Sequence, residues 1–190
     1  MGSTKSDHGL KAWPLVGTEA VADCRVFSVS RTWVREPRAG GRSHPFYRID
    51  AGEWVNVIPV TRDEEVVMVR QYRHGAREFT LEIPGGIVDP GESPVEAAAR
   101  ELLEETGYRA GSVQPLGALN PNPALFGNRV HTFLAEGCER VGDVVNPGLE
   151  ETAVECVPRR HLDDRVRAGD IDHALVIAAL HWWRLHPTGS

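Results

Sequence analysis

The segment from Ser93 to Gly107 limits the possible folds of this chain more than any other part of the sequence. Ser93 is a favourable N-cap residue, Pro94 suits the first helical position, and Glu96 is placed to complete a capping box with Ser93. Gly107 can adopt the left-handed conformation that commonly ends a helix. The residues in between are mostly good helix formers, so the sequence predicts a helix over this segment.

The predicted helix has an apolar side and an acidic side. At about 100° per residue, one side collects small and apolar residues: Val95, Ala98, Ala99, Leu102, Leu103 and Thr106. A different side carries Glu101, Glu104 and Glu105, which are spaced i, i+3 and i+4. Carboxylates this close repel one another unless a cation lies among them, and Arg100 cannot neutralise all three. Such a dense set of oxygen ligands suits hard divalent cations, which also bridge to phosphate oxygens.

A merely solvated acidic face is the alternative interpretation of these glutamates. The preceding glycine pair, Gly85 and Gly86, and the additional carboxylate of Glu92 favour a metal site instead. The whole pattern from Gly86 to Tyr108 resembles the Nudix box, with every charged and glycine position filled and Tyr108 at the final aliphatic position. Because the pattern is long and its spacing is fixed, the resemblance is specific.

The resemblance implies a metal-binding role for several of these positions. Glu101, Glu104 and Glu105 would bind the catalytic metals, assisted by the backbone carbonyl of Gly85. Glu104 therefore counts both as a ligand and as a catalytic residue. The expected cofactor is Mg²⁺, for which Mn²⁺ can substitute. Such metals clamp a diphosphate, neutralise its developing charge and lower the pKa of the attacking water.

Four other positions of the box are expected to be structural. Arg100 would pair with Glu92 and hold the loop against the helix, a role that we favour over direct catalysis. Gly86 and Gly107 would permit backbone shapes that a side chain obstructs.

The base that activates the water is expected outside the helix. In one branch of this family, the base is often a glutamate on a loop after the central strands. Glu150 and Glu151 occupy a suitable place, and Glu150 is the preferred candidate. An acidic surface loop without catalytic function is the alternative for both.

The flanks of the box resemble the branch of ADP-ribose and nucleoside diphosphate sugar pyrophosphatases. The similar segments lie at 71–73, 81–86, 120–123 and 169–174. In place of the Ser-Pro-Gly-like turn of that branch, this chain has Pro-Asn-Pro-Ala-Leu at 121–125. Members of the branch typically form two-fold dimers in which N-terminal strands cross to the partner. A homodimer with swapped N-terminal strands is therefore expected.

Three residues outside the box are candidates for substrate binding. Arg73 could grip phosphate oxygens with two hydrogen bonds, or form a salt bridge at a strand edge. Glu82 could position the substrate or a water, or form a cross-strand pair. Tyr47 could stack on a base, although aromatic residues more often belong to a core or an interface.

The order of the segments predicts an α/β or α+β sandwich. The resemblance specifies a Nudix fold, in which a mixed β-sheet lies between helices, with a small N-terminal β subdomain. We divide the chain into a disordered lead (1–12), an N-terminal β subdomain that takes part in dimerisation (13–50) and a catalytic domain (51–190). Patterns typical of strands occur at 21–34, 46–50, 53–59, 65–71, 79–83, 113–119, 130–135 and 152–157. Two more helices are expected at 162–168 and 171–185.

The composition excludes several classes of partner. The chain has 190 residues and a formal net charge of −6, which does not favour nucleic acid. Residues 1–11 lack the apolar core of a signal peptide, and the longest apolar stretch is too short to span a bilayer. The three cysteines have no paired spacing and fit a reducing compartment. We therefore expect a cytoplasmic protein without nucleic-acid or membrane partners.

The resemblance of the box and its flanks implies a Mg²⁺-dependent pyrophosphatase that converts ADP-ribose to AMP and ribose 5-phosphate. GDP-mannose or another nucleotide sugar is the alternative substrate. A non-catalytic nucleotide sensor is the alternative class, and the intact set of Glu101, Glu104 and Glu105 argues against it. RNA decapping and the removal of damaged nucleoside triphosphates share the box, but no basic stripe supports RNA binding.

Overall fold

The computed structural model describes residues 8–37, 40–146 and 151–186, and the chain divides into two compact units. The first unit comprises Met1–Ala51 and Asn122–Gly127, and the second comprises Gly52–Pro121 and Asn128–Ser190. Each unit has its own β-sheet. Whether the units are separate domains with the predicted boundaries stays a prediction.

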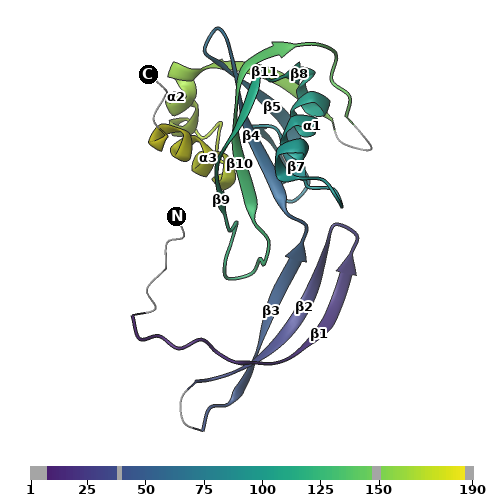
Figure 1. The fold of residues 1–190 in the computed structure, drawn as a ribbon, viewed down its shortest axis with the longest axis vertical. Helices are drawn as coiled ribbons and strands as arrows, with labels where there is room; N and C mark the ends of the chain where they lie inside the picture. Colours follow the sequence, from purple (N-terminus) through teal and green to yellow (C-terminus); the bar gives the residue numbers. More distant parts are fainter. Residues whose placement is uncertain (1–7, 38–39, 147–150, 187–190) are drawn as a thin grey trace. The chain divides into compact units, whose positions relative to one another are not determined.

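The first unit is an antiparallel sheet of three strands in the order β1-β2-β3 (Figure 1). The strands are β1 (Leu15–Cys24), β2 (Phe27–Arg35) and β3 (Ser43–Ala51). The loop Asn122–Gly127 belongs to this unit because Ile49 of β3 pairs with Phe126. The short β-favouring runs predicted within 21–34 correspond to the end of β1 and most of β2, and a tight turn in which Arg25 has a φ of 39° joins the two strands.

The second unit contains an eight-stranded mixed sheet. Its strands are β4 (Trp54–Thr61), β5 (Glu65–Arg73), β6 (Glu78–Glu82), β7 (Gly85–Ile87), β8 (Tyr108–Arg109), β9 (Ser112–Leu119), β10 (Val130–Arg140) and β11 (Thr152–Pro158). The main path is β11-β5-β4-β10-β8, and β6, β7 and β9 pair with β5, β4 and β10. The pair β4–β10 is parallel and the other pairs are antiparallel, which makes the sheet mixed as predicted.

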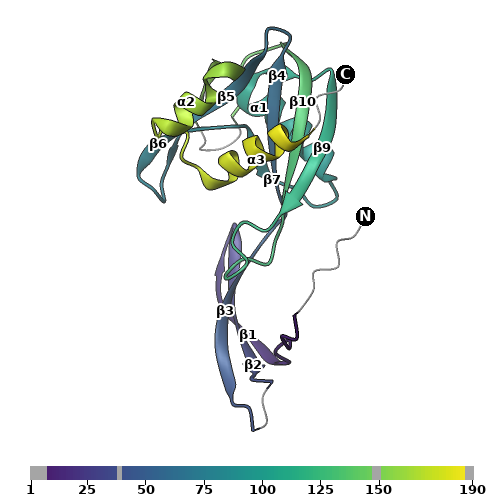
Figure 2. The same ribbon diagram turned by 90° about the vertical axis from the view of Figure 1, so that its left-hand side faces the viewer.

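Helices cover both faces of this sheet. The helices are α1 (Pro94–Thr106), the short 3₁₀ helix η1 (Arg159–His161), α2 (Leu162–Arg167) and α3 (Ala174–Leu185). Figures 1 and 2 show α1 on one face and α2 and α3 on the other. The predicted sandwich of a mixed sheet between helices is confirmed. None of the helices in the described ranges is both long enough and apolar enough to cross a membrane.

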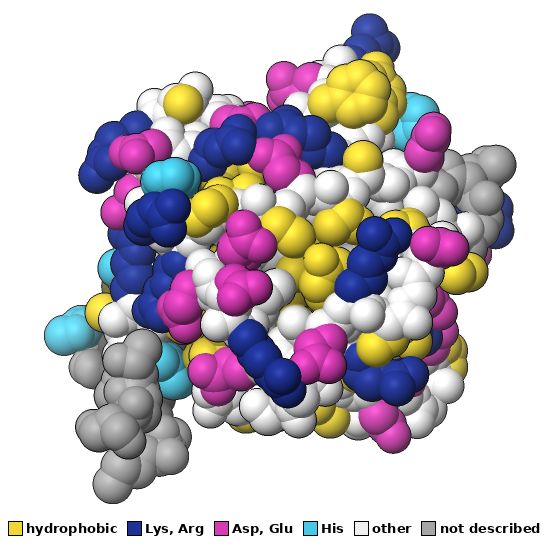
Figure 3. All heavy atoms as spheres, turned by 90° about the horizontal axis from the view of Figure 1, so that it is seen from above, with side chains coloured by type: hydrophobic (Ala, Val, Ile, Leu, Met, Phe, Trp, Pro, Cys, Tyr) yellow, Lys and Arg dark blue, Asp and Glu magenta, His cyan; other side chains and the backbone are white. Residues whose placement is uncertain are grey.

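Strand β4 supplies side chains to both hydrophobic cores. Val55 and Val57 pack with Ala98 and Leu102 of α1. Ile58 belongs to the other core, which also contains side chains of α3. This alternation is what a strand buried on both faces requires, because successive side chains point to opposite sides. Acidic and basic side chains are interspersed around a small apolar area on the face viewed in Figure 3.

The buried face of α1 differs from the predicted apolar side. Val95 and Leu103 are 42% and 38% exposed, and Ala99 is exposed as well. The buried residues are Ala97, Ala98, Leu102, Glu105 and Thr106. The helix is turned so that one of its carboxylates faces the sheet, where a backbone N–H group of β7 meets it.

Candidate active site

Local hydrogen bonds fix both ends of α1 as the sequence predicts. The hydroxyl of Ser93 accepts from the backbone N–H of Glu96 at 3.4 Å, and the Glu96 carboxylate accepts from the backbone N–H of Ser93 at 2.8 Å. The pKa of Glu96 is lowered mainly by its hydrogen bond with the Ser93 side chain and, to a smaller extent, by that with the Ser93 backbone N–H. At the other end, Gly107 has a φ of 72° and its N–H bonds to the carbonyl of Leu103. The orientation of the glutamates along α1 is therefore set by a well-defined helix.

Strand β7 lies so close to β4 on one side and to helix α1 on the other that two glycines are needed. A Cβ atom on Gly85 would lie 2.4 Å from the carbonyl oxygen of Val55. A Cβ atom on Gly86 would lie 2.1 Å from Oε1 of Glu101. The N–H of Gly85 donates to Oε2 of Glu105 at 3.0 Å, which joins the strand to the helix. The Gly85–Gly86 segment thus limits the positions of Glu101 and Glu105, two of the predicted metal ligands.

Arg100 connects the loop before the helix to the glutamate cluster. Its guanidinium forms two hydrogen bonds with Glu92, of 3.0 and 2.9 Å, and one of 3.1 Å with the carbonyl of Ile87. It also bonds to Glu101 at 2.9 Å and Glu104 at 3.3 Å. The bond to Glu92 is the main cause that raises the pKa of Arg100, and the pKa of Glu92 is lowered in return. Arg100 therefore stays charged and orients three carboxylates.

The donor set fits a divalent cation. Within the described ranges, no group of three or more His, Cys, Asp or Glu residues forms a ready-made metal site. Arg100 lies between Glu101 and Glu104, while Glu105 bonds to β7. These three carboxylates and that of Glu92 still outnumber the single guanidinium, and Glu105 is only 3% exposed. An excess of partly buried negative charge is costly, and an oxygen-binding cation would relieve it.

Tyr108 fills the last position of the box with an aromatic ring instead of an aliphatic side chain. The ring packs against the core between α1 and the sheet. Its hydroxyl lies 3.5 Å from Sγ of Cys156. This contact and burial raise the pKa of Tyr108 to about 12. The apolar function of the position is therefore retained.

Arg73 and Glu82 are bonded to each other. Two hydrogen bonds of 2.7 and 2.8 Å join them, and Thr80 donates a third to Glu82 at 2.7 Å. Burial alone would raise the pKa of Glu82, but the bonds and the charge of Arg73 outweigh it, so the pKa is lowered. The Glu82 side chain is 4% exposed and the Arg73 side chain 43%, so only Arg73 keeps substantial access to solvent.

Strand register places this pair on the same side of the sheet as α1. Thr152 of β11 pairs with Gln71 of β5, and Gln71 pairs with Thr80 of β6. Paired residues point to the same face, as do residues two apart. Thr152 marks that face, because its hydroxyl donates to the carbonyl of Glu105 at 3.0 Å. Arg73 and Glu82 therefore share the face that carries the glutamate helix.

Gln71 is a further candidate for substrate binding, to which the sequence analysis assigned no role. It is 8% exposed, and its side chain forms no hydrogen bond with any residue of the described ranges. A buried strand that alternates Val67, Val69 and Gln71 carries the signal, since a polar residue breaks an apolar series on one face.

The two loop glutamates differ in what the structure shows. Glu150 lies outside the described residues. Glu151 is exposed and directly precedes Thr152, which bonds to the Glu105 carbonyl. The start of β11 is therefore held against the end of α1, and Thr152 is a further residue of the site that sequence reasoning missed.

Tyr47 belongs to the first unit, on β3. It is 52% exposed and lies opposite Arg31 of β2. Its predicted contact with a base stays a prediction.

Comparisons with known proteins agree with this geometry. Residues 52–180 match the family model described as the NUDIX domain. The ADP compounds hydrolase NudE of Escherichia coli is 28% identical over 171 residues, which are 87% of this chain and 88% of that protein. An ADP-ribose pyrophosphatase of Mycobacterium tuberculosis is 29% identical over 167 residues, or 87% and 80% of the two chains. A crystal structure of an ADP compounds hydrolase superposes with a TM-score of 0.82 and 27% identity, covering 96% of each chain.

Proposed function

This chain belongs to the Nudix hydrolase family, and we propose that it hydrolyses the diphosphate bond of ADP-ribose or a related nucleoside diphosphate sugar. The products are a nucleoside monophosphate and a sugar phosphate. The observation that carries the proposal is the glutamate cluster of α1, fixed against Gly85 and Gly86 by a hydrogen bond and a close approach. The names of two relatives and of the matching crystal structure all concern ADP compounds, and they support an ADP-containing substrate.

The proposed cofactor is Mg²⁺, with Mn²⁺ as a substitute. Glu101, Glu104 and Glu105 would hold it, with the backbone carbonyl of Gly85. When bound, the metal would neutralise the diphosphate and lower the pKa of a water molecule. Arg100 keeps Glu101 and Glu104 in place through its hydrogen bonds, so the ligands need little rearrangement.

The proposed base is Glu150, with Glu151 as the alternative. The carboxylate of the base accepts a proton from the attacking water as the new O–P bond forms. The bridging oxygen of the diphosphate leaves with the phosphate that the water does not attack. The position of Thr152 supports a base from this loop, since its bond to the Glu105 carbonyl keeps the start of β11 beside the helix.

The proposed substrate contacts are Arg73, Glu82 and Tyr47. Arg73 is held by Glu82, so its exposed guanidinium edge is presented in a defined orientation to a phosphate or a ribose. Glu82 then acts mainly by positioning Arg73, because it is buried and already bonded three times.

We also propose a homodimer formed through the first unit. Its aromatic residues Trp13, Phe46 and Tyr47 are 43%, 52% and 52% exposed. Large exposed aromatic side chains on a small sheet are typical of a surface that a partner covers. The cytoplasmic location proposed for the protein is supported by its three free cysteines.

A substrate panel tests the function. ADP-ribose, GDP-mannose, other nucleotide sugars and nucleoside triphosphates would be incubated with Mg²⁺, Mn²⁺ or EDTA, and the products separated by chromatography. We expect AMP and ribose 5-phosphate from ADP-ribose, and no turnover in EDTA. Preferred cleavage of GDP-mannose would change the substrate and keep the reaction. If every diphosphate ester stays intact with both metals, the hydrolase proposal fails.

A further inference from the structure

Two arginines and two carboxylates form a closed ion-pair ring beside strand β5. Arg70 of β5 donates to Glu155 of β11 at 2.7 Å and to both carboxylate oxygens of Asp170 at 2.9 and 3.0 Å. Arg165 of α2 donates to the same two acids, to Glu155 at 2.6 Å and to Asp170 at 2.5 Å. Each guanidinium bridges both acids, so the ion-pair ring joins β5, β11, α2 and the segment after α2.

The ion-pair ring lies on the face of the sheet opposite to α1. Successive side chains of a strand point to opposite faces, so Arg70 points away from the face that carries Gln71 and Arg73. Glu155 shares the face of Arg70, because it pairs with Met68, which is two residues before Arg70 on β5. The ion-pair ring therefore lies directly behind the part of β5 that carries two of the candidate substrate contacts.

That part of β5 no longer has strand β4 as its neighbour. Among the described residues, β4 and β5 are paired only at Val60 and Val66. Farther along, β5 lies between β11, which ends the main path of the sheet, and the five-residue strand β6. A segment between short or edge strands opens more easily than the centre of a sheet, because fewer buried contacts restrain it. The hydrogen bonds of the ion-pair ring add a restraint from the helix layer.

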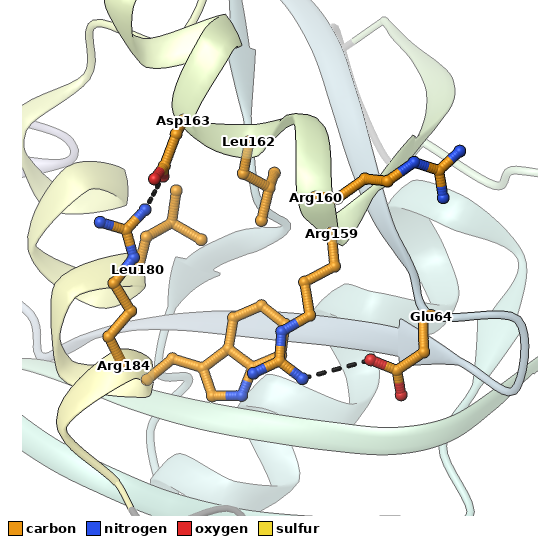
Figure 4. Close-up of a pocket in the computed structure, with 8 residues that line it drawn as sticks. Glu64, Arg159, Arg160, Leu162, Asp163, Leu180 and Arg184 are labelled. Carbon is orange, nitrogen blue, oxygen red and sulfur yellow. Dashed lines mark hydrogen bonds and ion pairs between the residues drawn. The ribbon is translucent and has the colours of Figure 1, made fainter.

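Helix α2 is itself attached to its neighbours, so it can support the ion-pair ring. Leu162 of α2 is buried in the core that α3 also lines. Asp163 of α2 pairs with Arg184 of α3 (Figure 4). In the preceding helix η1, Arg159 donates to Glu64, directly before β5, at 3.2 Å (Figure 4). The arginine that α2 contributes to the ion-pair ring therefore comes from a helix held on both α3 and the start of β5.

Asp170 is held through its backbone as well as its side chain. Its N–H bonds to the carbonyl of Arg165 at 3.0 Å, and the next residue, Ile171, is fully buried. Burial acts to raise the pKa of Asp170, but the hydrogen bonds from Arg70 and Arg165 outweigh it, so the pKa is lowered. Glu155 and Asp170 are only 27% and 25% exposed, and ion pairs in a bidentate network stabilise more than isolated surface pairs.

We propose that the ion-pair ring is a positioning device for substrate binding, which fixes the segment of β5 that carries Gln71 and Arg73. The proposal rests on the proposed function of the chain. A displaced guanidinium binds a phosphate less well. The metal ligands of α1 are held separately, by Gly85 and Arg100. Loss of the ion-pair ring should therefore raise KM and leave kcat nearly unchanged.

The kinetic test uses Asp170→Asn, which keeps the shape of the side chain and removes its charge. With ADP-ribose, or the nucleotide sugar that the substrate panel prefers, we expect KM to rise by about tenfold and kcat to change by less than about twofold. Arg70→Gln should have a similar effect, and the double variant no larger one, because both changes break the same ring. A fall in kcat at unchanged KM, or additive effects of the two changes, would overturn the proposal.

Asp164→Asn is the matched control. Like Asp170, Asp164 pairs with an arginine of α2, in this case Arg167. Both side chains of the control pair are 72% exposed and lie within α2, so the pair does not reach the sheet. KM and kcat of Asp164→Asn should equal those of the native protein. A similar rise of KM in this variant would show a general effect of charge and overturn the proposal.

Amide hydrogen exchange tests the ion-pair ring without turnover. In Asp170→Asn, the protected amides of residues 70–73 should exchange about tenfold faster, whereas those of Val57 and Ile58 in β4 should keep their rates. Arg165→Lys keeps the charge but cannot bridge both acids in the same way, so it should show the same pattern to a smaller extent. This milder variant serves as the test if Asp170→Asn does not fold.

The exchange rates also separate this proposal from the proposed function. Equal acceleration in β4 and β5 would show general destabilisation, and unchanged exchange in β5 would show that the ion-pair ring restrains nothing; either result overturns the proposal. If the native protein cleaves none of the nucleotide sugars, the hydrolase proposal fails. The exchange rates would still decide whether the ion-pair ring positions β5.

Discussion

Glu105 belongs both to the candidate site and to the buried contact between α1 and β7. It is 3% exposed, and its Oε2 accepts from the N–H of Gly85. The spacing of the glutamates predicted an acidic face, but it could not show that one of them would be buried. That outcome depends on β7, which is a separate segment of the chain.

Glu105→Gln is expected to abolish most turnover while the fold is kept. The amide retains an acceptor for the Gly85 N–H but removes a negative charge that a metal needs, so we expect kcat to fall by about 100-fold or more. AMP release and thermal unfolding would be measured together. Glu78→Gln, at an exposed strand position, is the control. Normal turnover in Glu105→Gln would contradict its role as a ligand.

Gln71→Leu tests whether a buried amide on the α1 face contacts the substrate. The change keeps the approximate shape and removes one donor and one acceptor, so kcat/KM should fall by about tenfold, mostly through KM. The melting temperature should change little, because the amide forms no hydrogen bond within the described ranges. Gln114→Leu on β9 is the control, at an exposed glutamine whose amide bonds to Glu136. An unchanged KM would remove Gln71 from the site.

Arg73→Met probes the buried carboxylate of Glu82 through pH. In the native protein Arg73 lowers the pKa of Glu82, so the stabilisation is present at neutral pH and lost only as pH falls through that lowered pKa. Without Arg73, burial dominates and the pKa rises above its unfolded value. The variant should lose about 1–3 kcal/mol at pH 7 and less at pH 4, where Glu82 takes up a proton. Denaturant unfolding at both pH values measures this. A loss that grows on acidification would contradict the ion-pair account.

At the scale of elements, the approach of β7 to α1 determines where the carboxylates lie. Gly86→Ala would place a Cβ atom 2.1 Å from Oε1 of Glu101, so this side chain must move away from Arg100 and its neighbours. Because small displacements of reacting groups are costly, we expect kcat/KM to fall by about 100-fold with a modest loss of stability. Gly75→Ala is the control, since a Cβ atom there meets nothing within 4 Å. Full activity in Gly86→Ala would show that Glu101 can relocate freely.

Elements whose signals are local were predictable, and elements that depend on distant partners were not. The ends of α1 follow from Ser93, Glu96 and Gly107, which act within one or two turns. The side that α1 buries depends on the sheet, so Val95, Ala99 and Leu103 lie on the apolar side of the helix and are nevertheless exposed. Similarly, no local pattern shows that Arg70 would join Glu155 and Asp170, which lie 85 and 100 residues away.

At the scale of the whole molecule, the proposed dimer can be tested by mass. Light scattering at micromolar concentration should give about twice the chain mass of 20.9 kDa, because a partner subunit would bury the exposed aromatic residues of the first unit. The measurement would be repeated with and without Mg²⁺ to separate assembly from metal binding. A mass of one chain under both conditions would exclude the dimer.

The path of the chain through the three-stranded sheet of the first unit has an evolutionary consequence. Its strands end at Ala51, yet Asn122–Gly127 returns to it and bonds to Ile49 from within the catalytic sequence. A single exchange of coding sequence near residue 51 would separate these two segments. The sheet is therefore not an interchangeable module. We expect insertions and deletions in β3 and in the 122–127 loop to have been inherited together.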